Sequence, residues 1–164
     1  MTDIERLLAI EEIRSLCARR LRFMDTKQWD LYATIHTEDV VTDNFGGYPA
    51  DRRPQGGGES GRASGNEMLT QMIRDLMEKP VPMTSCHHAH NPEIEMTSDT
   101  TARGTWAMED RLWWQNGETE ESLHGFGFYH ERYEKIDGIW KISYRKLERT
   151  RVSHTPNFYD RLYA

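Results

Sequence analysis

Three of the seven histidines lie within four positions of one short stretch, Thr84 to Met96, which reads T-S-C-H-H-A-H-N-P-E-I-E-M. The apolar residues that flank it predict a β-strand. Because the unperturbed pKa of histidine lies nearest to neutrality, a strand that carries imidazoles can carry proton-transfer chemistry. Ordinary hydrogen-bonded histidines and a metal site are the alternatives. The spacing alone leaves open which of His87, His88 and His90 does chemistry.

Side-chain alternation along the predicted strand divides these histidines between its two faces. Strict alternation places His88 and His90 with the apolar residues that follow, and leaves His87 on the other face. The pair Asn91-Pro92 interrupts the stretch, and a proline inside a strand usually marks an edge or a bulge. A bulge at this point would shift the register, so alternation does not identify the working histidine.

A carboxylate lies on the apolar face of a second predicted strand, Thr100 to Trp114. Alternation groups Asp110 with Trp106, Met108 and Leu112. Burying an isolated charge costs several kcal/mol, so Asp110 must be paired, hydrogen-bonded or protonated. We interpret it either as a functional acid or as half of a structural ion pair with an arginine on a neighbouring strand.

In the following strand, Phe126 and Phe128 share one face with His130, whereas Gly125 and Gly127 lie on the other face. Glycines inside a strand indicate sharp curvature or the close approach of a ligand. This strand is therefore a candidate wall of a binding pocket.

The segments that must position these residues begin with two helices. Apolar residues at helical spacing predict a long helix over Asp3–Met24. Asp25 and Gln28 form a second start signal, for a short helix that ends near His36. The simplest interpretation of Asp25 is therefore the N-cap of that short helix.

The chain between the second helix and the histidine stretch is mixed. Val40–Asn44 is predicted as a short strand. Gly46–Gly65 is rich in Gly, Pro and Arg without apolar periodicity, which indicates a mobile loop or a lid. Asn66 can cap a third helix, which Pro80 would stop.

From Thr84 onward the apolar period is two, and three turn signals separate the runs: Ser98-Asp99, Asn116-Gly117 and Asp137-Gly138. Four long antiparallel strands are predicted. Helices first and strands last indicate an α+β domain, with three helices on one face of a curved, mainly antiparallel sheet that encloses a pocket. We place this single domain at residues 1–152 and a tail at residues 153–164.

The last strand is predicted to bury Trp140, Ile142 and Tyr144 in the core. The basic run Arg145 to Arg151, R-K-L-E-R-T-R, is interpreted as a solvated strand edge. The formal net charge of -6 disfavours nucleic acid as a partner. The sequence has no long apolar run, which excludes a membrane span, and two cysteines form no disulfide framework, which favours the cytoplasm.

Several motifs in this order resemble the SnoaL-like branch of the nuclear-transport-factor-2-like superfamily. They are F-M-D-T-K-Q-W-D from Phe23, T-S-C-H-H-A-H-N-P-E-I from Thr84 and E-R-Y-E-K-I-D-G-I-W-K-I from Glu131. Within that branch the chain looks closest to the bile-acid 7α-dehydratases, through H-x-x-H-x-P-E-I from His87 and G-x-W-x-x-E-D-R-L from Gly104. The resemblance implies a cone-shaped α+β roll with a pocket between helices and sheet.

The resemblance also implies a set of site residues. An Asp–His dyad would be carried by Asp25 and His87, with Asp110 as a further functional acid and Arg149 as its arginine. The dehydratases have a tyrosine five residues before the dyad aspartate, and this chain has Arg20 there, which would assist the leaving group. The remaining residues expected to bind substrate are His90, Trp29, Trp106, Phe126 and Phe128.

We therefore expect a cofactor-independent lyase (dehydratase) or isomerase that acts on a hydrophobic hydroxy-carbonyl molecule, steroid-like or polycyclic. His87 would be the general base, and neither a metal nor an organic cofactor would be needed. The alternative is a non-catalytic protein of the same fold that binds a small molecule or a partner chain. An exposed sheet face and the aromatic tail from Phe158 to Tyr163 favour a homo-oligomer, a trimer or a dimer.

Overall fold

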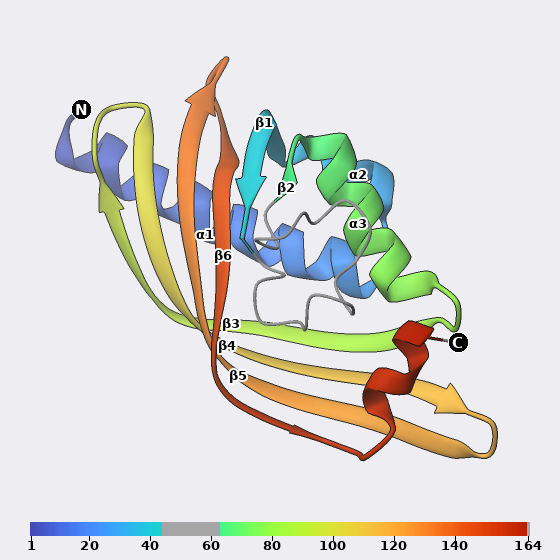
Figure 1. Ribbon diagram of the computed structural model, residues 1–164. Helices are drawn as coiled ribbons and strands as arrows, with labels where there is room; N and C mark the ends of the chain where they lie inside the picture. Colours follow the sequence, from blue (N-terminus) through green and yellow to red (C-terminus); the bar gives the residue numbers. More distant parts are fainter. Residues whose placement is uncertain (44–62, 164) are drawn as a thin grey trace.

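The computed structural model describes residues 1–43 and 63–163 (Figure 1). Helices come first in the chain, and long strands make up its second half. The elements are α1 (Asp3–Asp25), α2 (Trp29–Thr34), β1 (His36–Thr42), β2 (Ala63–Ser64), α3 (Asn66–Glu78), β3 (Met83–Met96), β4 (Thr101–Asn116), β5 (Thr119–Ile136), β6 (Ile139–His154) and the 3₁₀ helix η2 (Phe158–Tyr163). The predicted loop Gly46–Gly65 lies outside the described residues, except for its last three.

One six-stranded sheet has the order β2-β1-β6-β5-β4-β3. All neighbours are antiparallel except β1 and β6, which are parallel. The sheet bends strongly, and the three helices lie on its concave side, with α1 running across it and α3 beside α2 (Figure 1). The predicted α+β roll is confirmed.

Helix α1 begins with the expected capping box, in which Thr2 and Glu5 bond each other's backbone N–H. It ends where Lys27 adopts a left-handed φ of 56° and the Gln28 N–H bonds the Phe23 carbonyl at 2.7 Å. Asp25 is the last residue of α1, and the N-cap of α2 is Gln28. The prediction that Asp25 caps the second helix is therefore wrong.

A bulge in β3 resolves the histidine register. His90 pairs with Ala107 and Glu93 pairs with Thr105, so β3 has one residue more than β4 at this point. Asn91 takes up the extra residue with a φ of 43°. The irregularity suggested by Asn91-Pro92 is present, and it places His87 on the helix-covered face together with Ile94 and Met96.

A second bulge turns part of the basic run inward. Arg132 pairs with Tyr144 while the next residue, Tyr133, pairs with Ile142, so Ser143 is an extra residue in β6. Tyr144 therefore leaves the core face, and Arg145 enters it with 3% of its surface exposed. The predictions of a buried Tyr144 and of a fully solvated arginine edge are both wrong for this reason.

The C-terminal segment packs on its own chain. Phe158 is buried, and its carbonyl accepts a hydrogen bond from the Trp114 indole N–H at 3.0 Å. Arg161 donates to the backbone carbonyls of Val81 and Leu76. For Phe158, the expectation of an aromatic tail left in solvent is wrong. Within the described part of the chain, no helix is both long and apolar enough to cross a membrane.

Candidate active site

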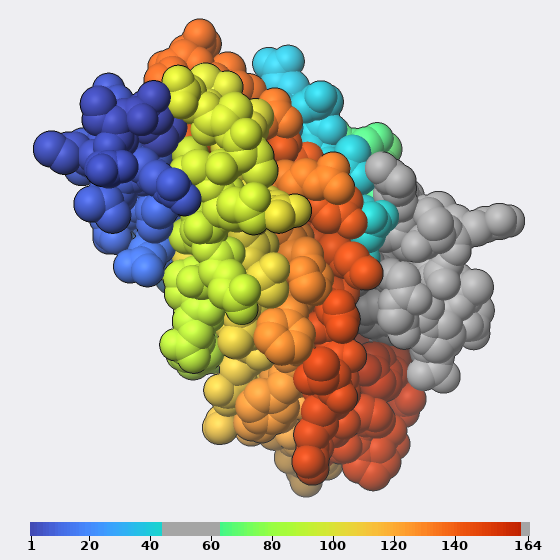
Figure 2. All heavy atoms as spheres, turned by 90° about the vertical axis from the view of Figure 1, so that its left-hand side faces the viewer, coloured from blue at the N-terminus to red at the C-terminus, as the bar shows by residue number. Residues whose placement is uncertain are grey.

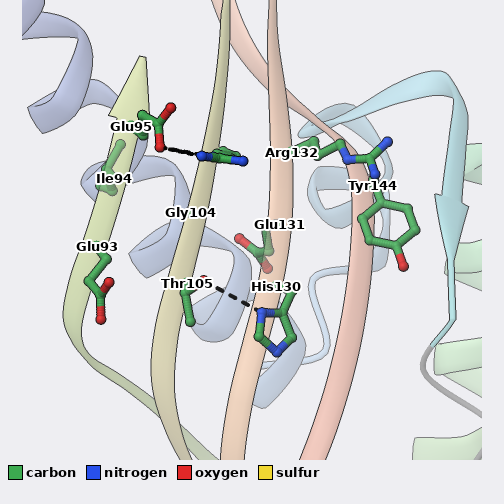
Figure 3. Close-up of a pocket in the computed structure, with 10 residues that line it drawn as sticks. Glu93, Ile94, Glu95, Gly104, Thr105, His130, Glu131, Arg132 and Tyr144 are labelled. Carbon is green, nitrogen blue, oxygen red and sulfur yellow. Dashed lines mark hydrogen bonds and ion pairs between the residues drawn. The ribbon is translucent and has the colours of Figure 1, made fainter. Parts of the chain in front are cut away.

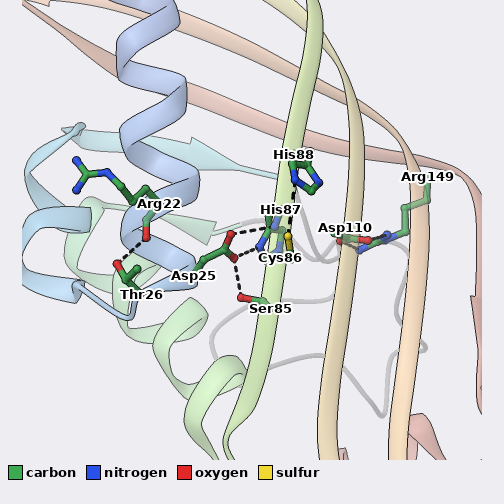
Figure 4. A network of polar contacts seen from close by, with 9 residues as sticks. All are labelled: Arg22, Asp25, Thr26, Ser85, Cys86, His87, His88, Asp110 and Arg149. Carbon is green, nitrogen blue, oxygen red and sulfur yellow. Dashed lines mark hydrogen bonds and ion pairs between the residues drawn. The ribbon is translucent and has the colours of Figure 1, made fainter.

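The end of α1 and the middle of β3 meet at a hydrogen-bonded pair (Figure 4). His87 Nδ1 lies 2.6 Å from Asp25 Oδ1, and the His87 backbone N–H donates to Oδ2 at 2.9 Å. Ser85, on the same side of β3, donates its hydroxyl to Oδ1 at 2.7 Å. Since Asp25 accepts at Nδ1–H, the neutral ring keeps its free lone pair on Nε2, where a general base needs it.

Asp25 occupies a position that helix electrostatics disfavour. A carboxylate at a helix C-terminus faces the negative end of the helix dipole. Burial raises the pKa of Asp25, but the hydrogen bonds and charge of His87 and the hydroxyl of Ser85 outweigh it, so the pKa is lowered. The carboxylate is held in its ionised form by β3, which is what a dyad requires.

Asp110 forms an ion pair with Arg149 on the same face of the sheet. Arg149 Nη1 lies 2.8 Å from Asp110 Oδ1 and Nη2 lies 2.5 Å from Oδ2, a bidentate arrangement. The two residues are on β4 and β6, so the pair crosses over β5. Gly125 lies beneath it, and a Cβ there would collide with both side chains. The close approach that this glycine indicated is therefore made by an ion pair.

A cavity of about 70 Å³ lies between α3, the end of α1 and the sheet. Its polar wall contains the dyad histidine and the ion pair, together with two further side chains: His87, Asp110, Arg149, Tyr129 and Arg145. Its apolar wall is made of Met24, Ile73, Leu76, Met77, Met83, Leu112 and Leu147. The structure thus brings together Asp25, His87, Asp110 and Arg149 as predicted, and adds Tyr129 and Arg145.

Arg145 belongs to a buried cluster with an excess of positive charge. Glu131 lies between two arginines, 3.1 Å from Arg20 Nη2 and 3.5 Å from Arg145 Nε. Arg145 also donates to the Tyr32 hydroxyl at 2.6 Å, and Tyr133 donates to Glu131 at 2.6 Å. Two guanidinium groups therefore share one carboxylate in a site that is nearly free of solvent.

Tyr129 supplies a neutral hydroxyl to the same wall. Burial raises its pKa to about 12, although the charges of Arg20 and Arg145 oppose the shift. Arg20 lies over its ring at 4.5 Å. The sequence pattern provides a reason to place Tyr129 in the pocket, since it shares a strand face with two glycines. It provides none for Arg145, because strict alternation cannot predict the bulge at Ser143.

Three residues expected to bind substrate do not line this cavity. Arg20 is completely buried beneath it and pairs with Glu131. Trp29 donates its indole N–H to Glu78 at 2.6 Å, a bond that joins α2 to α3, and Trp106 donates to Tyr133 in the core. These placements correct the predicted pocket: Arg20 belongs to a buried ion-pair cluster, and the two tryptophans make hydrogen bonds elsewhere in the fold.

The other three lie on the convex face of the sheet, opposite the dyad. Phe126 and Phe128 are each 38% exposed, because Gly125, Gly127 and Tyr129 take the concave face of β5. His90 is exposed as well. Their predicted role in this pocket is wrong, since a side chain cannot reach the cavity through the sheet.

A larger depression, of about 540 Å³, crosses the convex face (Figure 3). It is lined by residues of β3 to β6 that include Glu95, Arg103, His130 and Arg132, and it shares no lining residue with the dyad cavity. Arg103 and Glu95 pair across it at 2.6 Å. Its buried carboxylate, Glu131, is already held by Arg20 and Arg145, whereas the smaller cavity is lined by the histidine that pairs with Asp25. The smaller cavity is therefore the candidate active site.

The structure is a curved α+β roll with a hydrogen-bonded Asp25–His87 pair on its concave face. The chain belongs to the SnoaL-like domain family, whose model matches residues 5–146. This result confirms the broad family that the sequence motifs indicated.

Solved structures share the fold over nearly the whole chain. A proposed scytalone dehydratase from Novosphingobium aromaticivorans is 17% identical, with a TM-score of 0.74 over 93% of this chain and 91% of that chain. Hexachlorocyclohexane dehydrochlorinase LinA-type3 from Novosphingobium barchaimii is 19% identical, with a TM-score of 0.76 over 94% and 95%. A Mycobacterium tuberculosis protein of unknown function is 24% identical, with a TM-score of 0.69 over 92% and 78%. At these identities the likeness concerns the fold.

Replacing Gly125 should disrupt the Asp110–Arg149 pair. Gly125→Ala is expected to lower the free energy of unfolding by about 3 kcal/mol or more, because the methyl group overpacks the strand and separates a half-buried ion pair. Gly138→Ala is the comparison: its Cβ meets no atom within 4 Å, and only its φ of +80° costs about 1–2 kcal/mol. Urea unfolding of both variants measures the difference, and equal losses would contradict the argument.

His36 should make the fold sensitive to acid. Burial and the charge of Arg145 lower its pKa well below the usual range, although its hydrogen bond to the Tyr32 carbonyl opposes this. The folded state thus keeps His36 neutral while the unfolded chain binds a proton below about pH 6.5, so stability is lost as pH falls through that value.

The variant His36→Asn keeps an N–H near the Tyr32 carbonyl and removes the titration. Between about pH 6.5 and pH 5, its unfolding free energy should fall less steeply than that of the wild type, by about 1.4 kcal/mol per pH unit. His154→Asn, at an exposed position, should match the wild-type slope. Parallel pH profiles for wild type and His36→Asn, measured by urea unfolding, would rule out a neutral buried His36.

Proposed function

We propose that this protein is a cofactor-independent lyase of the dehydratase type, or an isomerase, that acts on a hydrophobic hydroxy-carbonyl molecule. The observation that carries the proposal is the 2.6 Å bond between His87 Nδ1 and Asp25, on a ring that lines an apolar cavity. Names of proteins with the same fold, a dehydratase and a dehydrochlorinase, both denote eliminations and support this class.

The first step would be proton abstraction next to the carbonyl group. His87 Nε2 takes the proton from the α-carbon, and the C–H electrons move into an enolate. The enolate then reforms the carbonyl group and expels the β-hydroxyl, which leaves as water when the proton on His87 returns to it. In an isomerase the same proton returns to a different carbon. Asp25 stabilises the imidazolium in either case.

Two other residues of the polar wall fit the developing oxyanion. Arg145 brings the excess positive charge of its cluster to the cavity, and Tyr129 offers a neutral O–H donor. Asp110 already accepts two N–H bonds from Arg149, so we assign it to holding that guanidinium rather than to protonating the leaving group. The cavity is thus negative at Asp25 and positive at Arg145.

The substrate class follows from the apolar wall and the size of the cavity. Seven apolar side chains face the reacting groups, which favours a hydrophobic molecule. The volume of about 70 Å³ is below the roughly 300–1,000 Å³ of typical ligand pockets, so a polycyclic substrate would have to move side chains of this wall. The bile-acid 7α-dehydratase motifs make 7α-hydroxy-3-oxo steroids one class to test beside smaller β-hydroxy ketones.

The test separates proton abstraction from elimination. Wild-type protein is incubated in D₂O with a series of β-hydroxy ketones and with 7α-hydroxy-3-oxo-4-ene steroids, in which the conjugated C=C bond makes the C6 proton the acidic one. NMR follows both exchange of the proton that is abstracted and formation of the conjugated elimination product. His87→Ala and Asp25→Asn should each reduce exchange by about 10²–10⁴-fold, because the base is lost or held in the wrong tautomer.

The control variant is His130→Ala, a half-exposed histidine on the convex face, which should keep wild-type rates. Asp25→Asn should remain folded, because the amide oxygen introduced there can still accept one hydrogen bond, from Ser85 or from the His87 backbone N–H. Exchange that persists at the wild-type rate in a folded His87→Ala protein would exclude His87 as the base.

The second candidate is a non-catalytic binding protein of the same fold. The convex depression of about 540 Å³ is larger than the dyad cavity and separate from it, so a ligand bound there would lie far from His87. A calorimetric screen of hydrophobic carbonyl compounds distinguishes the two functions. Binding that His87→Ala leaves unchanged, with no chemical conversion of any bound compound, would favour the second candidate.

We also propose that the protein is a homo-oligomer, with a trimer ahead of a dimer. Phe126 and Phe128 lie next to each other on the same face of β5 and expose apolar surface on the convex side. Light scattering at micromolar concentration should give a multiple of the chain mass, and Phe126→Ser combined with Phe128→Ser should shift it toward the monomer. A monomer mass for the wild type would refute the proposal.

A further inference from the structure

The convex face of β3 to β5 carries a second group of histidines that the proposed reaction does not use. His88 and His90 project from β3, Glu109 from β4 and His124 from β5. Figure 2 shows this side of the molecule, where β3 to β6 lie side by side, with part of α1 (blue) at one edge and β1 (cyan) at the other. Figure 4 shows His88 pointing away from the Asp25–His87 pair.

The register of the sheet makes these side chains converge. His88 and His90 are two positions apart on one strand face, and their rings stack with centroids 5.6 Å apart and an interplanar angle of 21°. Glu109 is the cross-strand partner of His88. One ligand atom from each of His88, His90 and Glu109 lies within 4.8 Å of the other two.

The donor set matches a known preference of transition metals. Two imidazoles and one carboxylate suit Zn²⁺ and its neighbours Ni²⁺ and Cu²⁺, whereas Mg²⁺ and Ca²⁺ prefer oxygen ligands. Zn–N bonds of about 2.0–2.1 Å require the three ligand atoms to move closer together, which the two exposed histidines can do by rotating. Three protein ligands leave a coordination position open.

Neighbouring groups would support the carboxylate ligand. His124 Nε2 lies 2.7 Å from Glu109 Oε1, and Arg111 Nε lies 3.5 Å from the same oxygen. Within the described part of the chain both contacts are to Oε1, so Oε2 is available to a metal ion. Hydrogen bonds of this kind orient metal ligands and strengthen binding by about 10–100-fold.

We propose that His88, His90 and Glu109 form a binding site for a transition-metal ion of the Zn²⁺ type, with His124 positioning the carboxylate. The site lies on the opposite side of the sheet from the His87 cavity. It is independent of the proposed lyase reaction. It would give the convex face a metal-dependent contact for water or for a donor atom of another molecule.

A nearby pair provides a matched control. His130 Nε2 lies 3.0 Å from Glu148 on the same convex face, but among the described residues no third His, Cys, Asp or Glu joins them in a group that could hold a metal ion. A histidine–carboxylate pair alone should bind Zn²⁺ weakly, because it lacks the second imidazole. His130→Ala therefore removes a histidine from this face without touching the proposed site.

The experiment is calorimetric titration of full-length protein without an affinity tag with Zn²⁺. Co²⁺ absorption, which reports on the coordination geometry, is recorded in parallel. The wild type should bind one ion per chain with a visible Co²⁺ spectrum. His88→Ala, His90→Ala and Glu109→Gln should each weaken Zn²⁺ binding by at least about 10-fold and remove the Co²⁺ band, while His130→Ala should retain both.

Two outcomes would overturn the site. Equal Zn²⁺ affinity in the wild type and in the His88→Ala, His90→Ala and Glu109→Gln variants would mean an adventitious ion only. A loss in His130→Ala as large as in the site variants would mean diffuse binding to the convex face. Circular dichroism confirms that each variant is folded, which surface positions on a paired strand should permit.

Discussion

The hydrogen bonds that β3 makes to Asp25 hold the end of the longest helix against the sheet, and the cavity depends on them. A carboxylate at the C-terminus of α1 faces an unfavourable dipole, so its position is stabilised by the His87 ring, the His87 backbone N–H and Ser85. The bond to His87 Nδ1 also fixes the tautomer of the ring. Asp25 is thus an acidic residue at a helix end where acidic residues are disfavoured, and it is also a residue on which the proposed chemistry depends.

The charged side chains near the Asp25–His87 contact come from different strands, and the pairing of the strands, rather than closeness in the sequence, brings them together. Gly125 allows Arg149 on β6 to reach over β5 to Asp110 on β4, which neutralises both groups inside the roll. Arg145 precedes Arg149 by four residues on β6 and therefore lies on the same face. Its ion-pair partner, Glu131, also pairs with Arg20, so the negative charge of Glu131 is divided between two arginines. Positive charge is thus concentrated on the polar wall of the cavity, which also contains His87.

Periodicity was sufficient to predict the helices, the long strands and the buried position of Asp110, because each depends on local pattern. It failed for Arg145 and Tyr144, since one bulge at Ser143 exchanges their faces, and no residue type there signals an extra position. Phe126 and Phe128 were predicted to line the pocket, although alternation alone does not say which face of their strand the pocket adjoins. Their strand partners on the concave face are glycines, and the aromatic rings face outward. The dyad itself came from resemblance, and its 2.6 Å geometry comes from the fold.

Strand β3 carries two histidine environments on its two faces, and the sheet keeps them apart. His87 is largely enclosed, has a carboxylate partner on Nδ1 and faces an apolar wall, which are the surroundings of a base. His88 and His90 are exposed, stack on each other and meet a carboxylate from the next strand, which are the surroundings of metal ligands. The bulge at Asn91 lies beyond all three histidines, so the alternation that separates these two environments is intact where it matters.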